Sequence, residues 1–463
     1  SDTELDLGFV AVGDTKTETI TVHSNKNYGG STISTASFDD DQFSLNTSLP
    51  IEVEQYSKSQ VEINFSPVST GTQSGTMSLE NINPGFSGES GDFALSGNAF
   101  DLSDGVVEVP GEVPTIQEAI DASSDGDTVL VAAGTYVENI TIDKEIAVIG
   151  ADRETTIIDG DSSGSVVYFG SNAGTGALLK DFTIQNGTGR YGPHAASDAL
   201  CGGGIFLDDG SSPKLKRLII TNNRAEGRGA GIFKNTGATL LVRNTIINNN
   251  HGTDNSQLNG AGIGGDGGGD GSIIYGCTIE NNHATNESGG IHLPDHPVII
   301  NTIIANNTSN YRSSAIYAWG ASISNCTIMS NGDDGNSNND PALMTLGGQS
   351  LIQNTIIWDN YSVGKTIYYD NELRVEYSII EGLKEHFVDN GGYDQSFRLL
   401  WGEGNMGLDP LLNGDLSLQP NSPGIDAGDP NGFFNDSDGT RNDMGNSGGN
   451  GIIVLYDRSW ENI

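Results

Sequence analysis

The sequence predicts an all-β protein, in which a right-handed parallel β-helix of about 9 to 11 coils follows a β-sandwich and a short capping helix. Three observations support this fold class. Short Ile-rich runs recur about every 28 residues between Thr183 and Ser378. A second series of Gly-Ile pairs runs beside them at a similar spacing. Gly makes up 64 of the 463 residues, which is typical of a chain with many turns.

Residues 1–100 are predicted to form a separate domain of short strands. Strands with alternating apolar residues are expected at 19–22, 51–53, 61–65 and 93–95, with turn residues between them. Regular spacing of this kind predicts a β-sandwich.

Three motifs in this domain are specific enough to compare with known families. They are Leu5-Asp6-Leu7-Gly8, Phe65-Ser66-Pro67 and Leu95-Ser96-Gly97-Asn98-Ala99. The domain resembles the immunoglobulin-like choice-of-anchor modules of surface proteins. The resemblance implies a spacer or attachment domain, and it brings no catalytic residue with it.

Residues 101–127 are predicted to be a linker with one amphipathic helix. Within Thr115–Ser123, three apolar residues fall on one helix face, namely Ile116, Ala119 and Ile120. The end of a β-solenoid exposes its apolar interior, so we expect this helix to cap the first coil.

Residues 128–407 are predicted to wind into the β-helix. One series consists of Thr245-Ile246, Thr278-Ile279, Thr302-Ile303 and Thr327-Ile328, and the other of Gly204-Ile205, Gly231-Ile232, Gly262-Ile263 and Gly290-Ile291. Short strands separated by turns are typical of stacked parallel coils, and such crossovers are almost always right-handed. The leucine-rich repeat is the competing interpretation, but the periodic Leu and Asn-Leu spacing that it requires are missing.

An Asn follows the Ile-rich runs at a fixed distance. The residues concerned are Asn223, Asn249, Asn282, Asn306 and Asn331. Asn tolerates the left-handed backbone conformation of a turn, and stacked Asn side chains hydrogen-bond along the stacking axis. We therefore predict a structural ladder at these five positions rather than a catalytic site.

Further motifs lie at the two ends of the repeat region. They are Gly126-Asp127-Thr128-Val129, Gly134-Thr135-Tyr136 and the segment Asn421-Ser422-Pro423-Gly424-Ile425-Asp426. From residue 106 to about 445 the chain resembles the pectin-lyase-like β-helix superfamily. Residues 408–463, the predicted C-terminal cap and tail, resemble the tail of secreted bacterial β-helix surface proteins. The strand-like run at 451–456 is expected either to complete a sheet of its own chain or to pair with another subunit as an added strand.

Charge and composition exclude several classes of partner. The chain carries 61 Asp and Glu against 21 Lys and Arg, a formal net charge of −40. A field of this sign repels nucleic acid and anionic membrane surfaces. No apolar run is long enough to span a membrane, so we expect no direct membrane insertion. We interpret the chain as the mature form of a secreted, extracellular or cell-surface protein.

One face of the predicted β-helix combines aromatic and acidic residues. If the Ile of each Gly-Ile pair points inward, the next residue points outward. This gives a candidate carbohydrate-binding or contact face of Phe206, Asp208, Phe233, Asp266, His292, Tyr317, Trp319, Tyr368 and Asp370. Outward aromatic side chains suit sugar rings, but they are equally typical of ladders that only stabilise a sheet.

The sequence leaves the question of catalysis open. Glycoside hydrolysis needs two carboxyl groups that converge, and Asp is so frequent here that chance pairs are expected. Arg228, Asn259, Glu287 and Arg312 each stand four residues before an Ile that follows Gly or Ala, so they should stack on one edge. Their alternating charge favours an ion-pair network over a catalytic site.

Calcium is the only cofactor for which the sequence gives an argument. Asp436 and Asp438 alternate before Gly439, as in half of an EF-hand loop, but no Glu closes the motif. An ordinary acidic turn explains the same residues.

Two functions remain. The first is an extracellular structural or adhesive surface protein. It would be a rigid β-helical rod that self-associates with neighbouring subunits or binds cell-surface glycans. Strand exchange of its termini is one route to such association. The alternative is a secreted polysaccharide lyase or glycoside hydrolase that acts on the aromatic and acidic face. We favour the first because the catalytic motifs of the superfamily cannot be placed in this sequence.

Overall fold

A computed structural model describes residues 4–23, 31–54, 57–83, 86–191, 199–253, 259–268, 271–332, 341–360, 366–389 and 398–449. The chain divides into two compact units. One comprises Ser1–Ser123 with Asp127–Leu130, and the other comprises Ser124–Gly126 with Val131–Ile463. Within the described ranges, no helix is long and apolar enough to cross a membrane. The strand-like run at 451–456 lies outside the described residues.

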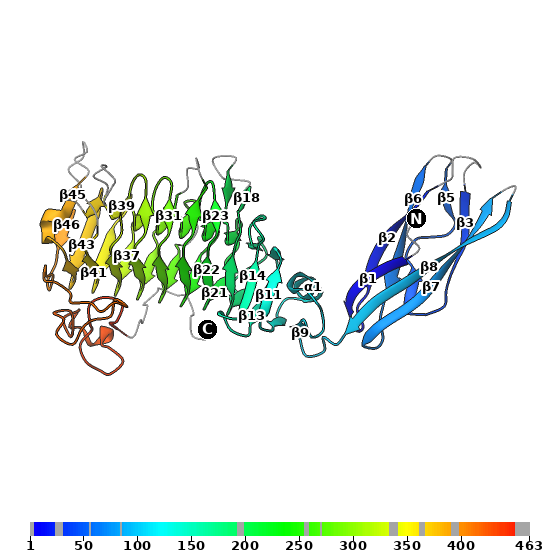
Figure 1. The fold of residues 1–463 in the computed structure, drawn as a ribbon, viewed down its shortest axis with the longest axis horizontal. Coiled ribbons are helices and arrows are strands. Elements are labelled where there is room, and N and C mark those ends of the chain that lie inside the picture. Colours follow the sequence, from blue (N-terminus) through cyan, green and yellow to red (C-terminus); the bar gives the residue numbers. More distant parts are fainter. Residues whose placement is uncertain are drawn as a thin grey trace. The chain divides into compact units, whose positions relative to one another are not determined.

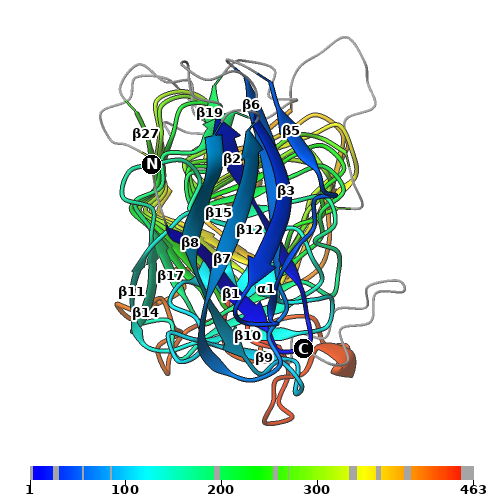
Figure 2. The ribbon, with the colours of Figure 1, turned by 90° about the vertical axis from the view of Figure 1, so that its right-hand side faces the viewer.

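The N-terminal unit is built from two β-sheets (Figure 2). Its first sheet has the order β1-β8-β7-β3-β5 and its second sheet the order β2-β6-β4. The strands are β1 (Glu4–Ala11), β2 (Lys16–His23), β3 (Ser31–Phe38), β4 (Phe43–Leu45), β5 (Ile51–Val53), β6 (Lys58–Phe65), β7 (Gly71–Asn83) and β8 (Phe86–Phe100). The four strands expected from sequence lie within β2, β5, β6 and β8.

Alternating residues of both sheets form one apolar core in this unit. Leu7, Val61, Ile63, Phe65 and Met77 are fully buried in it. Gly97 of β8 lies directly against the Phe65 ring, and any Cβ at this position would overlap the ring. The part of the N-terminal unit from β1 to β8 is therefore all-β, while its assignment to the immunoglobulin-like class stays a prediction.

The predicted helix is present as α1 (Ile116–Ala122). It lies between β9 (Val106–Val109) and β10 (Thr128–Val131) along the chain. The Thr115 side chain caps the helix by accepting a 3.2 Å hydrogen bond from the Glu118 backbone N–H, and it donates a 2.8 Å hydrogen bond to the Glu118 carboxylate. Ile116, Ala119 and Ile120 are buried as expected. Its function as a cap of the first coil stays a prediction.

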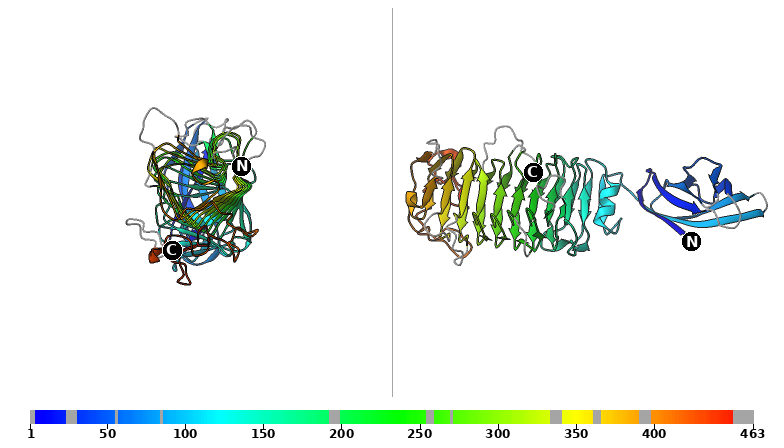
Figure 3. Two further views of the ribbon diagram at one scale, coloured as in Figure 1. Left: turned by 90° about the vertical axis from the view of Figure 1, so that its left-hand side faces the viewer. Right: turned by 90° about the horizontal axis from the view of Figure 1, so that it is seen from above.

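The second unit contains the stacked coils, which Figures 1 and 3 show as rows of parallel strands. We name its sheets after the repeats. The Gly-Ile sheet comprises β12 (Ile140–Ile142), β15 (Val167–Phe169), β20 (Ile205–Leu207), β24 (Ile232–Lys234), β28 (Ile263–Gly265), β32 (Ile291–Leu293), β36 (Ile316–Trp319), β39 (Leu343–Leu346), β42 (Ile367–Tyr369) and β45 (Phe387–Asp389). The Thr-Ile sheet comprises β11 (Gly134–Val137), β14 (Thr156–Asp159), β17 (Thr183–Gln185), β22 (Ile219–Thr221), β26 (Ile246–Asn248), β30 (Thr278–Glu280), β34 (Ile303–Ala305), β38 (Thr327–Met329), β41 (Ile356–Trp358) and β44 (Ile379–Ile380).

A third sheet completes each coil. Its strands in this unit are β13 (Ala147–Gly150), β16 (Leu178–Lys180), β21 (Lys214–Lys216), β25 (Leu241–Arg243), β29 (Ile273–Tyr275), β33 (Val298–Ile300), β37 (Ser322–Ser324), β40 (Ser350–Gln353), β43 (Glu372–Glu376) and β46 (Arg398–Trp401). Shorter pairings add β18 (Arg190–Tyr191) with β19 (Leu200–Cys201), and the row β23 (Arg224–Ala225), β27 (His251–Gly252), β31 (His283–Ala284) and β35 (Thr308–Ser309). The predicted parallel coils are thus confirmed.

Isoleucine fills the interior of the coils. In the Thr-Ile sheet, Ile220, Ile247, Ile279 and Ile304 occupy successive rungs in register, and none of them is exposed. Neighbouring rungs of a sheet lie about 4.8 Å apart, so each Ile packs on the one above and the one below. The three cysteines, Cys201, Cys277 and Cys326, are free and buried.

The Asn ladder exists, but two of its five predicted members are wrong. A continuous chain of side-chain hydrogen bonds joins Asn223, Asn250, Asn282, Asn307, Asn331 and Asn360, all buried. Asn249 and Asn306 instead lie one residue earlier, in left-handed turn conformation with φ of 54°. The two positions were predicted wrongly because the Thr-Ile pairs do not occupy equivalent places in the coils. Thr245 and Thr302 belong to the turn before the strand, whereas Thr278 and Thr327 begin the strand.

The described part of the C-terminal tail folds back along the Thr-Ile sheet. Met444 is fully buried against Ile356 and Ile379 at the last coils. The Asn325 amide donates a 2.9 Å hydrogen bond to Asn442, and the Gly445 N–H donates a 2.7 Å hydrogen bond to the Asn354 carbonyl. The 3-10 turn η2 (Gly432–Phe434) lies in this tail, whereas η1 (Leu383–His386) lies between β44 and β45 of the last coils. The tail therefore covers apolar side chains on the outer side of these coils.

Candidate functional site

The predicted contact face is one continuous column of the Gly-Ile sheet. Adjacent strands place Phe206 beside Phe233, His292 beside Tyr317, and Met344 beside Tyr368. The column begins one rung earlier than predicted, at Tyr168, which pairs with Phe206. Gly264 interrupts it between Phe233 and His292. The register predicted for these residues is therefore confirmed.

The predicted exposure of this column is wrong at its N-terminal end. Phe206 and Phe233 are fully buried, and they pack with Cys201 and Tyr168. The turn that precedes each strand folds back over the sheet. At Gly229, whose φ is +58°, an added Cβ would lie 2.8 Å from the Phe233 Cα. Repeated glycine thus lets the turn backbone take the place that we expected sugar rings to take.

Asp208 is held by its neighbours on the same face. Its carboxylate accepts a 2.5 Å hydrogen bond from the Tyr168 hydroxyl and a 3.1 Å hydrogen bond from the Asn235 amide. Burial raises the pKa of Asp208. The hydrogen bonds that the carboxylate accepts from Tyr168 and its other donors together have the larger effect, so the pKa of Asp208 lies below its usual value. The pKa of Tyr168 rises to about 12 through burial and the same hydrogen bond. The Arg190 guanidinium covers the Tyr168 ring at 3.7 Å from its centroid.

Asp266 and the predicted edge stack form one charged group, which we call the edge cluster: Arg228, Asp266, Glu287, His292 and Arg312. Arg228 and Asn259 pair as adjacent rungs, as the sequence predicted for this edge. Arg228 forms an ion pair with Asp266 and donates a 3.3 Å hydrogen bond to the Gly265 carbonyl. The second Asp266 carboxylate oxygen is buried and has no hydrogen-bond partner.

Glu287 is the centre of the second half of this cluster. Its carboxylate lies 3.3 Å from His292 Nε2 and 3.6 Å from Arg312 Nη1. The hydrogen bond from His292 holds the pKa of Glu287 below its usual value, although burial opposes it. Burial lowers the pKa of His292, whose ring stacks on Tyr317 with centroids 4.4 Å apart. A neutral His292 that donates its Nε2–H to an ionised Glu287 is consistent with the lowered pKa of both groups.

The C-terminal end of the face is the most open. Trp319 keeps 42% of its surface exposed, whereas Tyr317 and Tyr368 are partly buried. The Asp370 carboxylate accepts a 2.7 Å hydrogen bond from the Gly347 N–H. Trp319 is therefore the strongest remaining candidate on this face for contact with a sugar ring.

A buried ion pair inside the coils escaped the sequence interpretation. Lys234 is fully buried, and its ammonium group lies 3.2 Å from the Asp295 carboxylate. It also donates hydrogen bonds of 3.2 Å and 2.7 Å to the carbonyls of Asp266 and Gly268. Ser272 donates a 2.7 Å hydrogen bond to Asp295. The only sequence signal was a Lys at an inward position with Gly265 on the next rung, where the missing side chain leaves room.

The predicted calcium ligands are used as turn acceptors. Asp438 accepts a 2.9 Å hydrogen bond from the Thr440 N–H, and Asp436 accepts a 3.1 Å hydrogen bond from the Asp443 N–H. Burial raises the pKa of Asp436, and the charges of Asp438 and Asp426 raise it further. In the described ranges, no three His, Cys, Asp or Glu side chains are grouped closely enough to hold a metal ion. Calcium binding stays a prediction.

Comparison with known sequences assigns the central coils. Residues 165–335 match the family described as "Right handed beta helix region". This part of the chain is a right-handed parallel β-helix. No curated protein matches the chain.

Three solved structures each match a small part of the protein. The PapD-like domain 7 of human CEP192 is 14% identical with a TM-score of 0.19, over 22% of this chain and 83% of that one. The Vibrio cholerae VesB protease is 15% identical with a TM-score of 0.19, over 21% and 30% of the two chains. A family 123 glycoside hydrolase from Clostridium perfringens is 13% identical with a TM-score of 0.18, over 22% and 23%. Likeness this low gives no evidence on activity.

Proposed function

We propose that the protein is a secreted or cell-surface structural or adhesive protein, in which the β-helix is a rigid scaffold for contact with surface glycans or with further copies of the chain. One observation carries the proposal. The aromatic and acidic side chains of the Gly-Ile sheet are used within the sheet itself: Phe206 and Phe233 are buried, and Asp208 and Asp266 are held by Tyr168 and Arg228. Such contacts favour a stabilising ladder over an open catalytic cleft.

The packing of the coils supports the same function. Buried Asn side chains join six successive rungs, and the tail packs on the last coils. A scaffold with this many internal hydrogen bonds holds its surface residues at fixed spacing. Location outside the cytoplasm rests on the resemblance to surface modules.

A polysaccharide-cleaving enzyme is the second candidate, and the edge cluster is the observation that favours it. Glu287 combines an ionised carboxylate with a neighbouring imidazole and guanidinium, and its side chain keeps 16% of its surface exposed. These are the group types that general acid–base chemistry uses.

Activity screening separates the two candidates. We expect the purified protein to release neither reducing ends nor unsaturated products from neutral or uronate polysaccharides, and we expect negative-stain microscopy to show regular association or glycan-dependent clustering. Turnover that disappears in Glu287→Gln or Asp266→Ala, but persists in the exposed-site control Arg374→Gln, would overturn the proposal.

A further inference from the structure

The outer face of the Thr-Ile sheet carries a column of mostly apolar side chains. Where a strand of this sheet reads Ile-Ile, the second Ile points into the coil and the first points outward. The strand register stacks the outward residues Ile219, Ile246, Thr278 and Ile303 on four successive rungs, and all four are partly exposed. We call these four residues the outer strip. Strands that are apolar on both sides are typical of a sheet that is covered on both faces.

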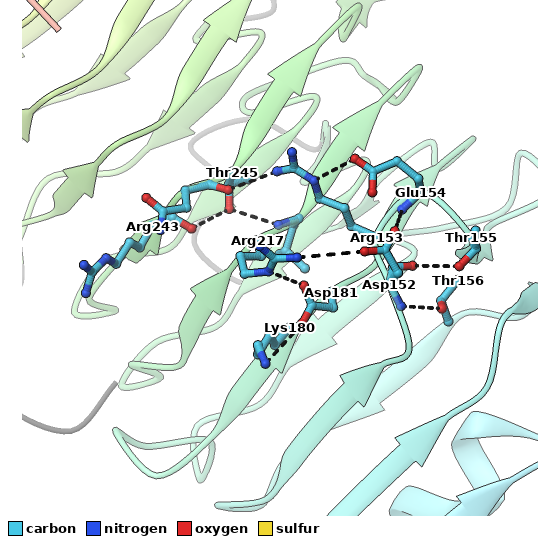
Figure 4. A network of polar contacts seen from close by, with 12 residues as sticks. Asp152, Arg153, Glu154, Thr155, Thr156, Lys180, Asp181, Arg217, Arg243 and Thr245 are labelled. Atoms are coloured by element: carbon cyan, nitrogen blue, oxygen red, sulfur yellow. Dashed lines mark hydrogen bonds and ion pairs between the residues drawn. The ribbon is translucent and has the colours of Figure 1, made fainter. Parts of the chain in front are cut away.

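On its N-terminal side, the same column is covered by a turn of the chain. Thr183 occupies the rung before the outer strip, where it is buried and donates a 2.6 Å hydrogen bond to the Arg153 carbonyl. The Arg153 guanidinium in turn donates a 3.3 Å hydrogen bond to the Asn244 carbonyl. Figure 4 shows Arg153 in a polar network in which Arg217 lies 2.6 Å from Asp181. This network forms one border of the outer strip.

On its C-terminal side, the column is covered by the tail. The next three outward residues, Thr327, Ile356 and Ile379, continue the register and are all buried. Met444 packs against the two isoleucines, and the Thr327 hydroxyl donates a 2.8 Å hydrogen bond to the Asn446 side chain. From Met444 to Asn446 the tail therefore runs along the column toward the outer strip.

Two side-chain acceptors beside the outer strip give a second, independent indication of a cover. Asn248 lies on the same outer face of β26 as Ile246, and Asn301 lies in the turn before β34. The Oδ1 atoms of both side chains are buried, and no group in the described ranges donates a hydrogen bond to either atom. Buried acceptors are normally paired, and an extended peptide offers backbone N–H donors. The outer strip therefore fits an apolar peptide segment.

We infer that the outer strip binds residues 451–456 of the same chain, Gly-Ile-Ile-Val-Leu-Tyr, as an extended segment along the axis of the β-helix. The described tail ends at Gly449, beside Asn325 on the rung of Thr327. The rung of Ile303 is the next one, about 4.8 Å away, and two residues reach at most about 7 Å. Six extended residues span about 17 Å from the first Cα to the last, and the four rungs span about 14 Å. Reach and length both match.

The contact hides an apolar surface that would otherwise be open to further copies of the chain. It is independent of the proposed function, because it joins two parts of one molecule. A second copy is the competing occupant of the outer strip. However, a segment tethered by two residues has an effective concentration in the millimolar range or above, which free copies in dilute solution do not reach. The chain's own segment is therefore the favoured occupant.

The first test measures how fast chymotrypsin cleaves the full chain after Leu455 and Tyr456, followed by intact mass spectrometry. The strip variant is Ile246→Asp/Ile303→Asp. The matched control, Leu130→Asp/Val137→Asp, makes the same change at two exposed apolar residues of the first coil. We expect the strip variant to lose residues 457–463 roughly 10- to 100-fold faster than the parent protein, because burial of one Ile corresponds to about a tenfold change in a contact equilibrium. The control should be cleaved at the rate of the parent.

The second test uses a chain that ends at Gly449 and leaves the coils unchanged. This shorter chain should bind the apolar-surface dye anilinonaphthalene sulfonate more strongly than the parent, and it should self-associate in sedimentation velocity. Equal cleavage of the parent, the strip variant and the control, or equal dye binding by the parent and the shorter chain, would overturn the inference. Protection from cleavage that disappears on dilution of a dimeric parent would assign the outer strip to a second copy, and would overturn it as well.

Discussion

Replacing Asn250 tests the Asn ladder where sequence and structure disagree. Asn250 is fully buried, and its amide donates to the Ile220 carbonyl at 2.9 Å and to Asn282 Oδ1 at 3.0 Å. Its own Oδ1 accepts from the Asn223 N–H and Nδ2, both at 3.1 Å. Asn250→Ala leaves the buried Asn223 N–H without its partner and removes the side-chain hydrogen bond to the Ile220 carbonyl. At about 1 to 3 kcal/mol for an unsatisfied buried donor, the free energy of unfolding should fall by about 1 to 3 kcal/mol.

Asn249 provides the matched control, because it is the neighbour that the sequence predicted for the ladder. It is exposed and adopts φ of 54°, a conformation that Gly adopts without strain. Asn249→Gly should therefore change stability by less than about 1 kcal/mol. Urea unfolding followed by far-UV circular dichroism measures both variants. Similar losses for the two substitutions would refute the hydrogen-bond assignment of the ladder.

Three further predictions concern buried and acidic groups. Lys234→Met should lower the free energy of unfolding by about 3 to 5 kcal/mol, because it leaves the Asp295 carboxylate buried without its cation. Lys234→Met/Asp295→Leu should regain much of this loss, and a double variant as unstable as the single one would contradict the prediction. The pKa of His292 is lowered in the folded state, so this imidazole binds a proton more readily in the unfolded chain, and stability should decline as pH falls through about 6.5. Melting curves between pH 8 and pH 5.5 should show a smaller decline for His292→Phe than for the parent protein. Equal declines would exclude His292 as the cause. If calcium binds at Asp436 and Asp438, added Ca²⁺ should raise the melting temperature of the parent protein but not of Asp436→Asn/Asp438→Asn, and an unchanged parent melting temperature after chelation would reject the site.

The fold was predictable because its signal is repeated. A hydrophobic pair such as Ile246-Ile247 recurs on every coil, so a single ambiguous run is corrected by its neighbours. The same repetition did not fix the register to one residue. Thr occurs both in the turn before the strand, as at Thr245, and at the first strand position, as at Thr278. Only the backbone pairing distinguishes the two, and this ambiguity displaced Asn249 and Asn306 from the true ladder.

The candidate site was predictable in its alignment but not in its exposure. Alternation along a strand correctly assigns Phe206, Phe233 and His292 to one side of the sheet. Whether that side meets water depends on the path of the preceding turn, which Gly202 and Gly229 bring back over the strand. Burial of this kind depends on contacts between segments, and a strand's own sequence contains no record of them.

The charged side chains of the third sheet are the clearest case of neighbours that cannot be recognised until the coils stack. Lys180, Lys216 and Arg243 are far apart in the sequence, and each lies in a chain where acidic residues dominate. Parallel pairing brings them onto three consecutive rungs, where their mutual repulsion has to be offset. Asp181 offsets part of it from within the protein, by pairing with Lys180. The remaining charge on Lys216 and Arg243 disfavours the folded state.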